Sequence, residues 1–138
     1  MEPAVKLRKT LKANGHSVTK ARLNTFAALV AAHHPITVVE LAEKLATVDK
    51  VSVYRSVELF ETIGVIHKVW TGFKSKIELS EIFSAHHHHF SCILCGQTES
   101  IKSPVLEDSL HNLEVEHGFE LRQHSVELSG HCNKCRTS

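Results

Sequence analysis

Apolar residues recur at helical spacing in four stretches of the first half of the chain. Each stretch is bounded by residues that start or stop helices, so four helices are predicted. They run from Pro3 to Asn14, from the N-cap Thr19 to His33-His34-Pro35, from Val38 to Leu45 after the N-cap Thr37, and from the N-cap Ser52 through Phe60 or Thr62 to the stop at Gly64. The spacing points Val53, Val57 and Phe60 of the last helix toward a core.

The pattern changes from helical spacing to alternation after Gly64. Residues 65–70 and 75–79 flank the turn Thr71-Gly72-Phe73-Lys74, and together they predict a β-hairpin. Helices followed by a hairpin in this order are the layout of a winged helix-turn-helix domain. In that layout the second helix of the helix-turn-helix enters the major groove of DNA, and the hairpin lies along the phosphates.

The second half of the chain combines alternating segments with one helix. Extended segments are predicted at 86–93, 97–101 and 119–128, and a helix at 104–116 begins with Pro104 and stops at Gly118. The predicted fold class is therefore α+β, with a winged-helix domain at 1–80, a hinge at 81–85 and a small α/β domain at 86–138. Because so small a sheet has an exposed edge, we expect dimerisation through the second domain.

The charge distribution separates the same two halves. A chain of 138 residues with 42% hydrophobic and 22% charged residues is typical of a globular protein, and no run is long enough to span a membrane. Residues 1–80 carry 12 Lys and Arg against 7 Asp and Glu, whereas residues 81–138 carry 4 against 8. The basic half is typical of a domain that binds a polyanion such as DNA, although a shift of this size also occurs by chance.

The only four cysteines form two pairs, Cys92 with Cys95 and Cys132 with Cys135. Two such knuckles can complete the tetrahedral Cys₄ shell of a structural zinc site. The alternative is two disulfides. The chain begins with a helix-forming segment rather than an apolar signal peptide, so we expect a reducing, cytoplasmic location in which disulfides are disfavoured.

Four consecutive histidines, His86 to His89, precede the first cysteine pair. Successive side chains of a strand point to opposite faces, so His87 and His89 face one way and His86 and His88 the other. The tract can therefore contribute to two different metal sites. A solvated polar tract is the alternative, and the neighbouring cysteine pairs argue against it.

The predicted recognition helix leaves four side chains toward solvent or DNA: Ser52, Tyr54, Arg55 and Ser56. Arg55 could read a guanine edge or hold a phosphate, and Tyr54 could pack on thymine methyls. On an isolated helix both would more often be ordinary surface residues, and it is the winged-helix layout that favours contact with DNA. Candidate phosphate contacts are Lys12, His16, Lys20, Arg22, Lys68, Lys74 and Lys76.

Several motifs together resemble the ferric uptake regulator family of metal-responsive bacterial repressors. They are the Val53-Tyr54-Arg55 segment, the run from His86 to Cys92, Cys95-Gly96, Glu116-His117-Gly118-Phe119, His124 and Gly130-His131-Cys132. The resemblance covers nearly the whole chain. It implies a homodimer that binds operator DNA through its winged-helix domain, with a dimerisation domain and, in many members, a Cys₄ zinc site.

The resemblance also implies two regulatory metal sites. A hinge site would take His87 and His89, Glu78 from the hairpin, and either His33 or His34 from the end of the second helix. An inner site of the dimerisation domain would take His86, His88, Glu107 and His124. The iron-type pattern usually has an aspartate where His88 stands, and the stretch from Glu78 to His86 is longer here.

The choice of metal follows from the donors. The four histidines and the Ile66-His67-Lys68-Val69 segment resemble the zinc uptake regulator branch, in which the hairpin histidine, here His67, can be a ligand. That branch often has a cysteine where this chain has Glu78. Imidazole suits zinc and Fe(II), and carboxylate admits Mn(II), so we expect zinc sensing, with iron or manganese as alternatives. Glu107 in place of aspartate disfavours the peroxide-sensing branch.

Two other functions fit the metal donors less well. A metallohydrolase needs an open coordination position beside a cleft, and the chain has neither an HExxH helix nor a nucleophile motif. A metal storage or chaperone protein would not need the basic helix-turn-helix. We therefore expect a repressor of metal uptake genes, with no enzymatic activity and no small-molecule substrate.

Overall fold

In the computed structural model, residues 1–72 and 74–136 are described. The chain divides into two compact units, Met1–Ala85 and His86–Ser138. Phe73, in the predicted hairpin turn, and the last two residues of the predicted second domain lie outside the described residues. Among the described residues, no helix is long and apolar enough to cross a lipid bilayer.

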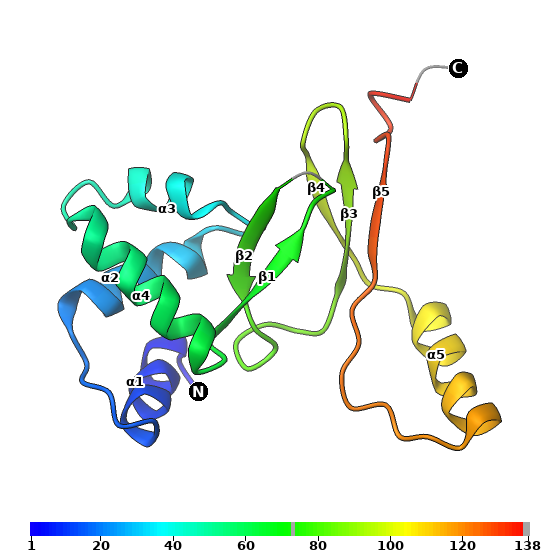
Figure 1. Ribbon diagram of the computed structural model, residues 1–138, viewed down its shortest axis with the longest axis horizontal. Coiled ribbons are helices and arrows are strands. Elements are labelled where there is room, and N and C mark those ends of the chain that lie inside the picture. Colours follow the sequence, from blue (N-terminus) through cyan, green and yellow to red (C-terminus); the bar gives the residue numbers. More distant parts are fainter. Residues whose placement is uncertain (73, 137–138) are drawn as a thin grey trace. The chain divides into compact units, whose positions relative to one another are not determined.

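The described residues of the first unit form four helices followed by a two-stranded antiparallel hairpin (Figure 1). Its elements are α1 (Pro3–Ala13), α2 (Lys20–Ala31), α3 (Val38–Lys44), α4 (Lys50–Thr62), β1 (Ile66–Trp70) and β2 (Ser75–Leu79). In the hairpin, Ile66 lies opposite Leu79 and Trp70 lies opposite Ser75. The predicted winged helix-turn-helix order is confirmed.

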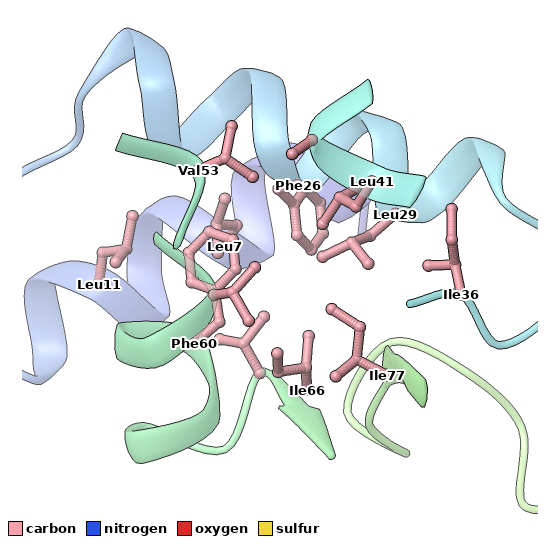
Figure 2. Close-up of a cluster of buried hydrophobic side chains, with 13 residues drawn as sticks. Leu7, Leu11, Phe26, Leu29, Ile36, Leu41, Val53, Phe60, Ile66 and Ile77 are labelled. Carbon is pink, nitrogen blue, oxygen red and sulfur yellow. The ribbon is translucent and has the colours of Figure 1, made fainter. Parts of the chain in front are cut away.

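One cluster of buried apolar side chains holds this unit together, and all six elements contribute to it (Figure 2). The ring of Phe26 in α2 meets the ring of Phe60 in α4 edge-on, with the ring centres 6.4 Å apart. Each fully buried side chain of this size stabilises the fold by about 1.5–3 kcal/mol relative to exposure. Because Val53, Val57 and Phe60 of α4 are in this cluster, the opposite face of α4 points to solvent.

The predicted N-caps of α2 and α3 are confirmed, and that of α4 is wrong. Thr19 accepts a hydrogen bond from the Arg22 backbone N–H at 3.2 Å, and Thr37 accepts one from Glu40 at 3.1 Å. Asp49 caps α4 instead of Ser52. The Asp49 carboxylate accepts one hydrogen bond from the backbone N–H of Ser52, at 2.9 Å, and one from the Ser52 hydroxyl, at 2.7 Å. The predicted recognition helix, α4, therefore begins at Lys50, earlier than predicted.

The segment after β2, which includes the predicted hinge at 81–85, packs on the first unit. The Phe83 ring lies against Phe26 with 5.0 Å between ring centres. The Lys6 ammonium group donates a hydrogen bond to the carbonyl oxygen of Ile82 and lies 5.8 Å from the centre of the Phe83 ring. These contacts tie the end of the first unit to α1 and α2.

Up to residue 136, where the described part ends, the second unit is a three-stranded sheet with one helix (Figure 1). Its elements are β3 (His88–Cys92), β4 (Thr98–Ile101), α5 (Pro104–His117) and β5 (Glu127–Gly130), and the strand order is β4-β3-β5. Strand β4 is antiparallel to β3, whereas β5 is parallel to it. A parallel pair needs a long crossover, which α5 and the segment after it provide.

The strand predicted from Phe119 to Leu128 begins only at Glu127. The described residues 119–126 form no helix or strand, and side chains accept hydrogen bonds from some of their backbone N–H groups. The N–H of Leu121 donates to Glu114 at 3.1 Å, and the N–H of Val126 donates to Nδ1 of His88 at 3.0 Å. Side chains from α5 and β3 thus replace the ladder hydrogen bonds that a longer strand would make.

Helix α5 begins and ends as predicted, but none of its apolar side chains is fully buried in this chain: Leu106 and Leu110 are partly buried, and the others are exposed. Ser103 accepts a hydrogen bond from the N–H of Leu106 at 3.2 Å, Pro104 follows at the first turn, and Gly118 ends the helix with φ of 70°. All residues of α5 are described, and none of them is buried. Val105 is 75% exposed and Val115 is 72% exposed.

Candidate metal centres and DNA-binding surface

The four cysteines converge in the second unit. Their sulfur atoms all lie within 4.8 Å of one another, and Sγ of Cys95 is 3.8 Å from Sγ of Cys132. Cys92 is the last residue of β3, and its sulfur accepts hydrogen bonds from the backbone N–H groups of Cys95, at 3.5 Å, and Cys132, at 3.4 Å. Each pair therefore forms a tight knuckle around a common point, as a Cys₄ zinc site requires.

The protonation of these thiols also fits a bound cation. The N–H groups of Cys95 and Cys132 lower the pKa of Cys92 to about 6. The hydrogen bond that the Cys135 thiol makes with the sulfur of Cys132 raises the pKa of Cys135 to about 12. Four sulfurs this close cannot all carry negative charge on their own, and a Zn²⁺ ion would stabilise all four thiolates together.

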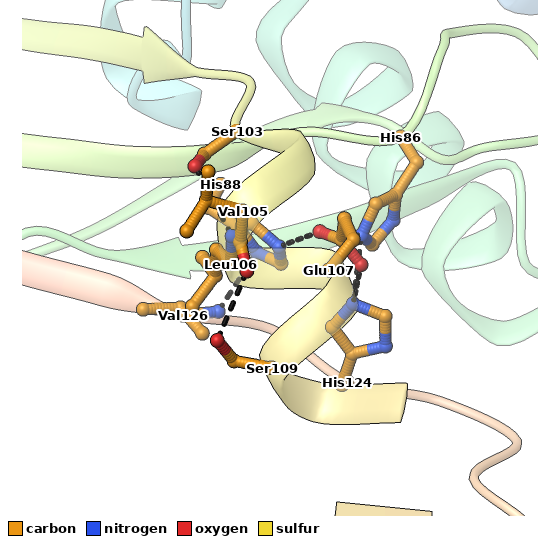
Figure 3. A network of polar contacts seen from close by, with 9 residues as sticks. All are labelled: His86, His88, Ser103, Val105, Leu106, Glu107, Ser109, His124 and Val126. Atoms are coloured by element: carbon orange, nitrogen blue, oxygen red, sulfur yellow. Dashed lines mark hydrogen bonds and ion pairs between the residues drawn. The ribbon is translucent and has the colours of Figure 1, made fainter. Parts of the chain in front are cut away.

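Three histidines surround the carboxylate of Glu107 in a second group, the inner cluster, formed by His86, His88, Glu107 and His124 (Figure 3). Oε1 of Glu107 is 2.6 Å from Nε2 of His88 and 3.2 Å from Nε2 of His86. Oε2 of Glu107 is 2.8 Å from Nε2 of His124, which is 2.9 Å from Nε2 of His86. The structure thus brings together all four residues that the family resemblance assigns to the inner site.

Separate elements position the inner cluster. His88 is the first residue of β3 and only 1% exposed, Glu107 lies in the first turn of α5, and His124 lies in the segment before β5. The hydrogen bonds from His88 and then His124 lower the pKa of Glu107, so its carboxylate is held in the charged form. Three imidazoles and one carboxylate are a donor set that fits a divalent transition metal ion.

The other two histidines of the tract form a separate pair. The rings of His87 and His89 lie 4.8 Å apart, and the rings of His86 and His88 lie 4.7 Å apart. This pairing agrees with the two faces that strand geometry predicts. His87 and His89 remain the predicted hinge ligands of the second unit.

The predicted hinge ligands of the first unit lie on the hairpin and at the end of α2. Glu78 on β2 lies directly opposite His67 on β1, and Oε1 of Glu78 is 2.9 Å from Nε2 of His67. After α2, both His33 and His34 are exposed, and Nδ1 of His34 donates a hydrogen bond to the Pro35 carbonyl oxygen at 2.9 Å.

The exposed face of α4 is the candidate surface for base contacts. Tyr54 is 43% exposed, and Arg55 is also exposed, as predicted. The expectation that Ser56 faces solvent is wrong, because it is 3% exposed and its hydroxyl donates to the Ser52 carbonyl oxygen at 2.8 Å. A small hydroxyl satisfied by its own helix can be buried in a core.

One exposed side chain of α4 was missed. Val51 is 56% exposed and precedes Tyr54 by three residues and Arg55 by four, so it lies on the same face of the helix. A correct choice of Asp49 as the N-cap would have placed Val51 inside the helix and revealed its position.

The candidate phosphate contacts lie around the same unit. Lys20 begins α2 and is exposed, as is Lys74 beside the hairpin turn. Arg22 is held by hydrogen bonds from Nη1 to the carbonyl oxygen of Ser17, at 2.6 Å, and to its hydroxyl, at 3.2 Å. Lys68 forms an ion pair with Glu61 at 3.6 Å. Their positions are compatible with phosphate contacts, which stay a prediction.

Comparison with known proteins decides the family. The model of the ferric uptake regulator family matches residues 13–129 of the chain. The chain belongs to this family. Ferric uptake regulator proteins are metal-responsive transcriptional regulators and not enzymes, and this member supplies the cysteine cluster and the inner cluster as donors for metal ions.

Relatives of this ferric uptake regulator family member span most of its length. It is 31% identical over 137 residues to the ferric uptake regulation protein of Yersinia pestis, covering 93% of this chain and 90% of that protein. It is 32% identical over 95 residues to the Bacillus subtilis protein of the same name, a match that spans 67% of this chain and 64% of that protein. The crystal structure of the Vibrio cholerae ferric uptake regulator is similar, with 29% identity, a TM-score of 0.77, and coverage of 91% of this chain and 99% of that one.

Proposed function

We propose that this regulator is a homodimeric repressor that binds operator DNA when a divalent metal ion occupies its hinge site, and that it controls genes for metal uptake. The observation that carries the proposal is the division of the histidine tract into two pairs. One pair belongs to the inner cluster within the second unit. The other pair is left for a site shared with the first unit, whose α4 presents Tyr54 and Arg55.

The switch follows from where the hinge ligands lie in the sequence. His87 and His89 belong to the second unit, whereas Glu78 and the α2-end histidine belong to the first. When bound, the metal ion supplies coordination bonds to side chains of both units. Metal binding can shift the population toward the DNA-binding arrangement only if that arrangement has the higher metal affinity. These four side chains would then fix the angle between the two recognition helices of a dimer.

The orientation of single side chains refines the hinge site. Metal-binding histidines usually donate their second ring N–H to a carbonyl or carboxylate oxygen, which leaves the other nitrogen ready to coordinate. His34 makes such a bond to the Pro35 carbonyl through Nδ1, so we infer that Nε2 of His34, rather than His33, is the ligand. On the hairpin, His67 contacts Glu78 and either orients its carboxylate or joins the ligand set.

The donor chemistry favours zinc as the sensed metal. The inner cluster has three imidazoles to one carboxylate, and the proposed hinge site has a similar excess of nitrogen donors. Imidazole-rich sites suit zinc, whereas Mn(II) prefers oxygen donors. Fe(II) and Mn(II) are the alternatives.

Uncovered apolar surface in the second unit supports a homodimer. Helix α5 has no buried residue, and Leu128 on the edge strand β5 is 50% exposed. A unit this small buries too little apolar surface to be stable by itself, and pairing with a second copy would cover α5 and β5. A dimer also supplies two recognition helices for the two halves of a palindromic operator. The proposed place of action is the cytoplasm, where operator DNA is found in bacteria.

The proposal is tested with regulator that holds zinc at its cysteine site and no metal at its other sites. This protein is titrated with Zn(II), Fe(II) and Mn(II) under anaerobic conditions. Fluorescence anisotropy of an AT-rich palindromic duplex reports DNA binding. We expect tight binding only with metal, at the lowest free concentration for Zn(II). Equal binding with and without each metal would contradict the proposal. His34→Ala should impair the metal response more than the matched variant His33→Ala.

A further inference from the structure

Val51 occupies the part of α4 that a recognition helix brings closest to the bases. The helix begins at Lys50, so Val51 lies in its first turn. In helix-turn-helix proteins, the N-terminal residues of the recognition helix contact base edges in the major groove. Val51 shares its exposed face with Tyr54 and Arg55, the residues already expected to contact DNA.

Neither packing nor helix stability explains a valine at this position. Its side chain is 56% exposed and is not part of the buried cluster that holds the first unit together. Valine is a poorer helix former than alanine, lysine or glutamate, which are the usual residues on exposed helix surfaces. Its two methyl groups are, however, held in one strongly preferred rotamer in a helix, so they form a rigid apolar contact.

The charges around Val51 identify the kind of partner. Lys50 and Arg55 flank it and favour a polyanion. The acidic residue nearest in the sequence is Asp49, whose carboxylate accepts hydrogen bonds from the hydroxyl and the backbone N–H of Ser52. These bonds lower the pKa of Asp49, and the positive charge of Arg55 lowers it further. Within the major groove, the apolar group that a methyl-bearing side chain can read is the C5 methyl of thymine.

We propose that Val51 is a specificity-determining residue that contacts the C5 methyl group of one thymine in each operator half-site. The inference rests on the proposed DNA binding by α4 and adds a base preference to it. Arg55 would hydrogen-bond to a guanine edge or a phosphate, and Val51 would distinguish thymine from cytosine at a neighbouring base pair. The Val51→Ala variant would no longer distinguish thymine from cytosine at that position, but it would keep its phosphate contacts.

The test uses a duplex selected from a random library by the zinc-loaded regulator. Each thymine of a half-site is replaced in turn by deoxyuridine, which removes only the C5 methyl group. For the unmodified regulator, the replacement should weaken binding about fourfold at one thymine position of the half-site and have little effect at the others. Fourfold is the effect of losing the burial of one methyl group. For Val51→Ala the same replacement should have no effect, and Val51→Thr, which keeps one methyl group and the shape, should retain part of the penalty.

Val39→Ala is the matched control, because Val39 on α3 is 57% exposed and does not lie on α4. It should keep the full deoxyuridine penalty. Val51→Ala with an unchanged penalty at every thymine, or an unmodified regulator with no such penalty, would overturn the role of Val51 while metal-dependent DNA binding stands. If the protein selects no duplex when loaded with Zn(II), with Fe(II) or with Mn(II), the proposed function itself fails.

Discussion

At the scale of single residues, Arg55 carries the most specific expectation about DNA. Its side chain is exposed on α4, and it follows Tyr54 in the sequence. Arg55→Ala should weaken operator binding by about 1–3 kcal/mol, because a guanine or phosphate contact is lost. Lys74→Ala should instead lower the slope of log affinity against log salt by about one, because it removes a phosphate contact.

Binding isotherms at several salt concentrations separate these two effects. The oligomeric state of both variants should match that of the unmodified chain. Unchanged operator affinity for Arg55→Ala would remove this face of α4 from the DNA interface.

Cys92 is the residue on which the zinc site depends most. Its sulfur is fully buried and accepts two backbone N–H groups, one from each cysteine knuckle. Cys92→Ser should release the zinc and lower the midpoint of thermal unfolding, because metal binding stabilises only the folded state. Zinc content and thermal unfolding check this together, and a zinc-free variant that unfolds at the original temperature would refute a structural role.

At the scale of elements, the start of α4 depends on Asp49. Hydrogen bonds from Ser52 hold the pKa of this carboxyl below its usual value. A carboxyl with a lowered folded-state pKa stabilises the fold above its unfolded pKa and loses that effect as pH falls through the folded pKa. Asp49→Asn keeps the cap acceptor without the charge, so it should unfold at a lower temperature than the unmodified chain at pH 7, with the difference vanishing in acid.

Thermal unfolding of the two proteins, compared at each pH, measures this difference, and effects common to both, such as loss of metal in acid, cancel. Asp49→Ala, which removes the acceptor as well, should be less stable than Asp49→Asn at every pH. A difference between unmodified chain and Asp49→Asn that persists below the carboxyl pKa would exclude the charge as its cause.

The elements that depend on local pattern could be predicted from the sequence. Helical spacing in α1 to α3 and alternation in the hairpin follow from side chains close in the chain. The sequence does not show whether Asp49 or Ser52 begins α4, since both are good N-cap residues. Only the structure shows that Asp49 accepts the hydrogen bonds and Ser52 donates them. Ser56 was misplaced because a serine can satisfy its hydroxyl within its own helix.

The candidate metal residues divide in the same way. The two faces of the histidine tract follow from strand geometry, and the spacing within each cysteine pair is local. Glu107 and His124 came from the family resemblance alone, because α5 and the parallel crossover bring them to His88 and no pattern in the sequence encodes that contact. The parallel pairing of β5 with β3 could not be predicted from the sequence either, since it depends on non-local packing.

At the scale of the whole molecule, the apolar surface of the second unit predicts its self-association. Leu128→Glu on β5 and Val115→Glu on α5 place a charge where 50% and 72% of the side chain is exposed in the single chain. Both should dissociate the dimer, because burying an unpaired charge in an interface is costly. Val39→Glu, at a similarly exposed position of the first unit, is the control and should stay dimeric. Light scattering after size-exclusion chromatography would contradict the prediction if all three variants kept the same mass.

The central claim is that a metal at the hinge, rather than in the inner cluster, switches DNA binding. The most direct measurement is the operator affinity of His89→Ala and His124→Ala with and without added Zn(II). His89→Ala should stay dimeric and zinc-bound at its cysteines but lose the metal-dependent increase in affinity, whereas His124→Ala should retain most of it, because its site lies within one unit. A full metal response in His89→Ala together with none in His124→Ala would contradict the account.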